Sequence, residues 1–167
     1  MAEESAQEKE RTDIQLEGNT GVWEMSLVGD VQGTYIGSFR FKGFLTPTQQ
    51  IAANRDYREL LGSNPTMVPE HESFLAYALT QLKYRIVSSP PFWSAARSAS
   101  LEGDVPDENV ISAALDAALA TEIKYRNQLK KKKLEAIERA KQAAEKAMNT
   151  NDEGLNEDEA QEDSGTP

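Results

Sequence analysis

The feature that most constrains this chain is a stretch of about forty residues that contains neither proline nor glycine. It extends from Asp107 to Met148 and is rich in alanine, lysine and glutamate, which favour helix formation. The preceding residues, Asp104-Val105-Pro106-Asp107, suit a helix start, because acidic side chains in the first turn interact favourably with the helix dipole. Such a helix measures roughly 60 Å at 1.5 Å per residue. Because a small domain is narrower than this, we predict that the distal half projects, frays or packs on another chain.

The apolar residues of this predicted helix fall into two groups. Before Leu129 they recur every three or four residues, as in a helix that faces a core. After Leu129 only a thin, alanine-rich seam remains among charged residues. The core-facing stripe consists of Val110, Ile111, Ala114, Leu115, Ala118, Leu119 and Ile123, and the seam consists of Leu134, Ile137, Ala140, Ala144 and Met148.

The sequence predicts a β-hairpin near the N-terminus. From Val22 to Val28, apolar residues alternate with Glu24 and Ser26, which is the period of a half-buried strand. Residues 29–33 supply turn chemistry, and the aromatic and β-branched residues of segment 34–45 predict the second strand. A two-stranded hairpin is only marginally stable alone, so we expect it to pack on helices or on another subunit.

Two further helices are predicted between the hairpin and the long helix. Thr46-Pro47-Thr48-Gln49 fits a capping box with proline at the first helical position, and Gly62 suits the C-terminal end after Leu61. A second helix is predicted from Glu70 to about Val87, before the stop signal Ser88-Ser89-Pro90-Pro91. The residues expected in the core are Trp23, Phe74, Leu75, Leu79, Leu82, Leu115 and Leu119.

These elements predict an α+β fold, with an antiparallel hairpin followed by three helices. The net charge of the 167 residues is −10, but residues 122–148 carry nine basic and four acidic residues, whereas residues 149–167 carry seven acidic residues and no basic one. We predict a disordered acidic N-terminus over residues 1–18, a folded region over residues 19–148 and a disordered acidic tail over residues 149–167, because the tails have too few apolar residues to offset their ordering entropy.

The residue content argues against an enzyme. The chain has no cysteine and one histidine, which excludes disulfides, cysteine-based zinc sites and multi-histidine metal sites. No serine lies in a G-x-S-x-G context, and no glycine-rich segment is followed by the Gly-Lys-Ser/Thr of a phosphate-binding loop. We expect no catalytic residue, no cofactor and no metal. We also expect no membrane partner, because no apolar segment approaches the roughly 18 residues of a spanning helix, and no secretory signal.

Two groups of residues are candidates for partner binding. The first group is a basic run of four consecutive lysines, residues 130–133. This run can contact an acidic partner, or it can pair with the acidic tail that follows about 20 residues later. We do not expect nucleic acid as the partner, because the run surrounds the helix, lacks interleaved aromatic residues and belongs to an acidic chain. The aromatic residues can anchor a partner or cap the core. The candidates are Phe39, Phe41, Phe92, Trp93, Lys130, Lys131, Lys132 and Lys133.

The order of these parts resembles that of small accessory proteins of tailed bacteriophages, and most closely the tail assembly chaperones. The resemblance extends over about residues 22–145. It is carried by the segments Phe41-Lys42-Gly43-Phe44-Leu45-Thr46-Pro47, Asn54-Arg55-Asp56-Tyr57-Arg58-Glu59-Leu60-Leu61-Gly62, Leu82-Lys83-Tyr84-Arg85-Ile86 and Pro90-Pro91-Phe92-Trp93, and by the C-terminal helix rich in lysine, glutamate and alanine.

The resemblance implies a non-enzymatic protein that keeps the tape-measure protein soluble in the host cytoplasm while the tail tube forms. Two alternatives remain open. One is a structural subunit of the virion, in the capsid or the tail, whose hairpin augments a neighbouring sheet. The other is an acidic regulatory protein that competes with nucleic acid for a basic surface. We expect phage structural proteins as partners, and we expect a homo-oligomer, because the aromatic hairpin and the long helix offer much apolar surface.

Overall fold

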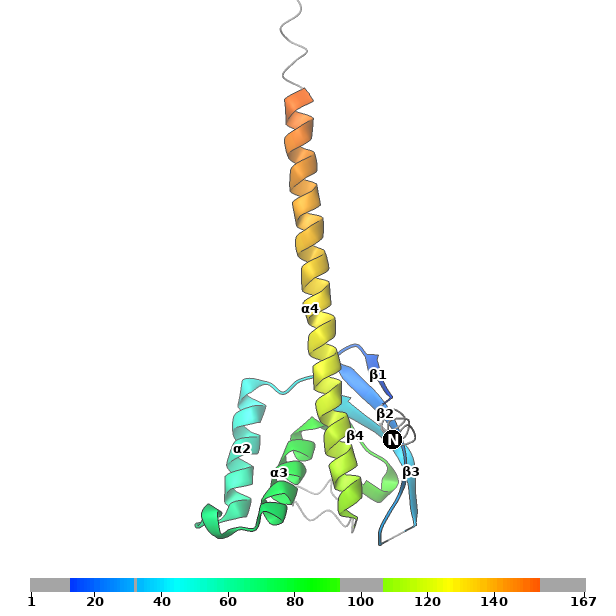
Figure 1. The fold of residues 1–167 in the computed structure, drawn as a ribbon, viewed down its shortest axis with the longest axis vertical. Coiled ribbons are helices and arrows are strands. Elements are labelled where there is room, and N and C mark those ends of the chain that lie inside the picture. Colours follow the sequence, from blue (N-terminus) through cyan, green and yellow to red (C-terminus); the bar gives the residue numbers. More distant parts are fainter. Residues whose placement is uncertain (1–12, 32, 94–106, 154–167) are drawn as a thin grey trace, which may run out of the picture. The chain divides into compact units, whose positions relative to one another are not determined.

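The fold is α+β, and in the part of the chain that the structure describes it has one antiparallel sheet and three α-helices (Figure 1). The computed structural model describes residues 13–31, 33–93 and 107–153, with side chains described as far as Lys146. The chain divides into two compact units, Met1–Arg126 and Asn127–Pro167. The elements are β1 (Ile14–Glu17), β2 (Thr20–Val28), β3 (Thr34–Lys42), α2 (Pro47–Leu61), the short 3-10 helix η1 (Pro65–Met67), α3 (Glu70–Arg85), β4 (Ile86–Ser88) and α4 (Glu108–Glu153).

The predicted hairpin is confirmed and forms the centre of the sheet. Strands β2 and β3 pair antiparallel with Trp23 opposite Phe39 and Met25 opposite Gly37. The alternation of the two strands places the aromatic side chains on one buried face, while Glu24 and Ser38 lie exposed on the other. This one-sided burial is what an antiparallel sheet with one solvated face requires.

The sheet has two edge strands that were not predicted. Strand β1 pairs with β2 and buries Ile14, so residues 14–17 of the segment predicted to be disordered are in fact ordered. Strand β4 places Ile86 opposite Phe41, so α3 ends at Arg85, two residues before its predicted end. Strands of three and four residues are too short to give a recognisable period, and they form because β2 and β3 offer free hydrogen-bonding edges. The predictions for residues 1–12 and 154–167 lie outside the described residues.

The helices follow their local signals. Helix α2 has the predicted bounds and the predicted capping box between Thr46 and Gln49, and Gly62 adopts a φ of 71° just after it. Helix α4 begins at Glu108, as the sequence predicts, and ends at Glu153, five residues after the predicted end at Met148. Helix α2 packs against α3.

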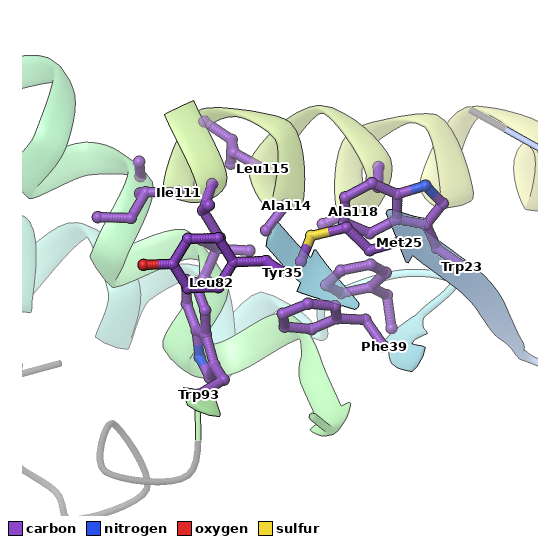
Figure 2. Packing of buried hydrophobic residues seen from close by; sticks show 14 of the residues in the cluster. Trp23, Met25, Tyr35, Phe39, Leu82, Trp93, Ile111, Ala114, Leu115 and Ala118 are labelled. Carbon is purple, nitrogen blue, oxygen red and sulfur yellow. The ribbon is translucent and has the colours of Figure 1, made fainter. Parts of the chain in front are cut away.

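The core lies between the aromatic face of the sheet and the helices α3 and α4 (Figure 2). Leu82 comes from α3, and small and medium residues of α4 fill the space over the sheet. Helix α4 can approach strand β2 closely because β2 has a glycine, Gly21, where the two elements meet. A Cβ atom added to Gly21 would lie 2.6 Å from the side chain of Thr121 in α4. The buried cluster consists of Ile14, Trp23, Met25, Tyr35, Phe39, Phe41, Ala78, Leu82, Trp93, Val110, Ile111, Ala114, Leu115, Ala117 and Ala118.

One core prediction is wrong. Phe74 is 42% exposed, although it shares a helical period with the buried Ala78 and Leu82. Leu75, Leu79 and Leu119 are partly buried against the core, and Trp23, Leu82 and Leu115 are buried as predicted. Phe74 belongs to the first turns of α3, and the core covers only the later turns of this face.

This difference predicts unequal costs for two substitutions on the same helix. Leu82→Ala is expected to lower the free energy of unfolding by about 2–5 kcal/mol, since it removes a side chain that is 1% exposed and leaves a cavity. Phe74→Ala should cost less, about 1 kcal/mol, because Phe74 lies outside the buried cluster. Urea denaturation of both variants measures the difference, and equal midpoints would contradict this description of the core.

Candidate interaction surface

Most of the predicted aromatic partner-binding residues lie in the core. Phe39 and Phe41 have no exposed surface, and Trp93 packs edge-on against Phe39 with 5.3 Å between ring centroids. Phe92 is half-buried, with its ring centroid 5.0 Å from that of Tyr35. The Pro90-Pro91-Phe92-Trp93 segment therefore caps the core, as one of the two sequence interpretations expected.

A buried carboxylate anchors the start of α4 to the hairpin. Asp107 is 1% exposed, and its carboxylate accepts hydrogen bonds from the Val31 backbone N–H and the Tyr35 hydroxyl, both at 2.6 Å. Burial and the hydrogen bond to Asp107 raise the pKa of Tyr35 to about 12. The sequence predicts Asp107 only as a residue of the helix start. Its contact with a tyrosine 72 residues away comes from the tertiary structure.

The Tyr35 hydroxyl gives a prediction at alkaline pH. The pKa of the phenol is about 12 in the folded state, whereas its ordinary value is 10.0. Its contribution to stability is therefore complete below pH 10 and is lost as the pH rises toward 12, because ionisation then favours the unfolded chain. In an ultraviolet titration, the ionisation of Tyr35 should appear as an absorbance change near pH 12. This change should be missing in Tyr35→Phe. In Asp107→Asn the change should move to lower pH, and an unchanged position would contradict the assigned cause.

A second carboxylate joins α2 to α3. Asp56 is 6% exposed and accepts hydrogen bonds from Lys83 Nζ at 2.7 Å, from the Tyr84 hydroxyl at 2.9 Å and from Arg55 Nη2 at 3.3 Å. The hydrogen bond from Lys83 is the main reason why the pKa of Asp56 lies below its ordinary value. Lys83 and Tyr84, which precede Arg85 in the sequence, therefore both contribute to the contact between α2 and α3.

A third carboxylate joins α3 to α4. The guanidinium of Arg85 is buried and donates hydrogen bonds to Glu122 and, at 3.3 Å, to Gln81 Oε1. Arg126 Nε donates to the other oxygen of Glu122 at 2.8 Å. Burial alone would raise the pKa of Glu122, but the hydrogen bonds from Arg85 and Arg126 outweigh it and hold the pKa below its ordinary value.

These three clusters join elements of the fold to one another. The carboxylates of Asp56, Asp107 and Glu122 are each satisfied by donors that join two elements of the structure. Within the described residues no group of three His, Cys, Asp or Glu residues could hold a metal ion. The single histidine, His71, is exposed and lies 3.1 Å from the carboxylate of Glu108. A shallow depression of about 400 Å³ near the end of α2 is lined by Arg55, Arg58, Glu59, Gly62 and Ser63.

The remaining sequence candidates lie on the unit that begins at Asn127. Every side chain from Asn127 to Lys146 is exposed, including Leu129, Leu134 and Ile137. This segment of α4 carries seven basic and three acidic residues. Its basic residues include the four candidates Lys130, Lys131, Lys132 and Lys133, all of them exposed.

The helical period divides this segment into faces. At about 100° per residue, six uncharged residues share an arc of about 120°, and we call this arc the α4 apolar face. It consists of Leu129, Ala136, Ile137, Ala140, Ala143 and Ala144. Leu134 lies outside this arc. An apolar arc of this width is typical of a helix that packs on another element.

Comparisons of the chain with protein-family models, with curated proteins and with solved structures found no match. In the described part of the chain, no helix has the length and apolar character needed to cross a membrane.

Proposed function

We propose that this chain is a non-enzymatic assembly protein that binds a partner protein through residues 127–146 of α4. One observation carries the proposal: all side chains of this helical segment are exposed, and large apolar residues are among them. In proteins, most helical stability comes from packing an apolar face on another element. A partner protein would supply that packing through Leu129 and Ile137 of the α4 apolar face.

The resemblance to tail assembly chaperones gives this binding a biological role. We propose that the partner is the tape-measure protein of a tailed bacteriophage, and that the chain keeps it soluble in the host cytoplasm while the tail tube forms.

An exposed apolar patch favours a second candidate, a structural subunit of the virion. Val28, Val31 and Ile36 lie at the end of the β2–β3 hairpin, and each is 71% exposed. A patch at a hairpin end can pack on a neighbouring subunit, and it would also serve the homo-oligomer that we expect. A chaperone would bind its partner through α4 and would be missing from the finished particle. A structural subunit would pack on its neighbours through the hairpin and would remain in the particle.

Co-expression with the tape-measure protein of the same phage tests the chaperone role. The intact chain should increase the soluble fraction of the tape-measure protein, and the double variant Leu129→Gln/Ile137→Gln should not. Leu134→Gln is the matched control, because it removes a leucine that is exposed but lies outside the α4 apolar face. Equal activity of all three chains would contradict the proposed binding segment.

Mass spectrometry of purified virions separates the two candidate functions. A chaperone should be abundant in infected lysate and missing from virions, whereas a structural subunit should be present in many copies. Substitution of Ile36 by Asp should impair particle assembly only if the hairpin patch is a subunit contact.

A further inference from the structure

The charges around the α4 apolar face are arranged by sign. Lys130 and Lys141 lie along one border of the face, and Lys132, Arg139 and Lys146 lie along the other. Lys133 projects from within the face. We call the five border residues the basic rim. The five rim residues and Lys133 are all exposed.

The acidic residues of the same segment lie on the opposite side of the helix. Glu135, Glu138 and Glu145 are centred about 180° from the middle of the α4 apolar face. Lys131 is the one basic residue of the segment that lies among them. The face that packing would bury is therefore bordered by positive charge alone.

We infer that the α4 apolar face binds an acidic amphipathic helix of a partner protein, and this inference rests on the proposed function. Aspartate or glutamate residues beside the apolar face of that helix would contact the basic rim. These charge pairs would determine which partner α4 binds, as flanking charges do in coiled coils. The four alanines leave space above the backbone of α4. Large side chains of the partner, such as leucine or phenylalanine, would fill that space to the density of a protein interior.

Other occupants fit this face less well. A second copy would place one basic rim against another, and like charges at an interface are unfavourable. A membrane surface calls for large apolar residues such as Trp, Phe and Leu, whereas this face has four alanines beside Leu129 and Ile137. The acidic residues 149–167 of the chain itself contain one large apolar residue, Leu155, so they match the charge of the rim but cannot fill the face.

The test uses the full-length chain and three synthetic amphipathic helical peptides that share one leucine-rich face. The peptides carry Glu, Gln or Lys beside that face, and fluorescence anisotropy measures their binding. We expect the Glu peptide to bind most tightly and to weaken as salt rises, because exposed charges are screened. The Lys peptide should not bind. Equal affinity of the Glu and Gln peptides would overturn the inference.

Neighbouring lysines provide the matched control. Lys132→Glu and Lys131→Glu change the net charge equally, but only Lys132 belongs to the basic rim. Lys132→Glu should weaken binding of the Glu peptide about fivefold or more, since each exposed charge pair contributes up to a few-fold in affinity, whereas Lys131→Glu should change it by less than about twofold. Circular dichroism checks that both variants remain helical. If both variants weaken binding of the Glu peptide equally, the net charge of the helix and not the basic rim determines the affinity, and the inference is overturned.

Three further probes test the other occupants. Vesicles of phosphatidylcholine and phosphatidylglycerol, and duplex DNA, should bind the chain less tightly than the Glu peptide does. Tighter binding to either would overturn the inferred protein partner in favour of a membrane or a nucleic acid. A gain of about tenfold or more in peptide affinity on deletion of residues 154–167 would assign the face to the chain's own acidic residues. If the Glu peptide fails but Leu129→Gln/Ile137→Gln still abolishes solubilisation of the tape-measure protein, the proposed function stands and the acidic partner does not.

Discussion

Replacing Glu122 with alanine is expected to lower the free energy of unfolding by about 3–5 kcal/mol, which is typical when one partner of a buried ion pair is removed. The reason is the environment of Arg85, which is 4% exposed and donates to Glu122 from α3. Without the carboxylate, the buried guanidinium keeps only the hydrogen bond to Gln81 among the contacts described above. Chemical denaturation monitored by circular dichroism measures the loss.

Two controls separate the buried pair from the exposed one. Arg126 also donates to Glu122, but its side chain is 66% exposed, so Arg126→Ala should cost about 1 kcal/mol or less. The double variant Arg85→Met/Glu122→Leu should recover most of the lost stability, because apolar residues can replace a buried pair without leaving an unpaired charge. A double variant no more stable than Glu122→Ala would contradict this account.

The same pair adds an acid-dependent component to stability. The pKa of Glu122 in the folded chain lies below its ordinary value of 4.5. Its contribution is therefore present above pH 4.5 and is lost as the pH falls through the folded-state pKa. The stability of the wild-type chain should decline more steeply below pH 4.5 than that of the double variant.

Truncation after Arg126 is expected to abolish partner binding and to leave the fold of the remaining chain intact. The buried residues of the described chain all lie between Ile14 and Thr121, so the truncated chain keeps its core. The melting temperature should change by less than about 5 °C, which corresponds to roughly 1 kcal/mol for a domain of this size. Calorimetry and the co-expression assay give the two readouts. A truncated chain that no longer unfolds cooperatively would contradict the division into two units.

The elements that were predicted correctly from the sequence are those whose signals lie within a few residues. The capping box at Thr46 and the glycine at position 62 specify α2, and the alternation around Trp23 specifies the hairpin. The absence of Pro and Gly from Asp107 to Met148 favours α4. Local backbone preference and side-chain period determine such elements, and both can be read from neighbouring residues. The basic run at Lys130 was visible for the same reason.

The tertiary structure decided which residues are buried and which charges are paired. Strands β1 and β4 exist because the central hairpin offers edges for pairing, and their own three or four residues carry no sufficient signal. Phe39 is in the core and not on a partner surface because α3, α4 and the Trp93 segment cover that face of the sheet. Contacts between Tyr35 and Asp107, or Arg85 and Glu122, join residues separated by 72 and 37 positions. Such contacts depend on how complete elements pack, and no local sequence pattern specifies that packing.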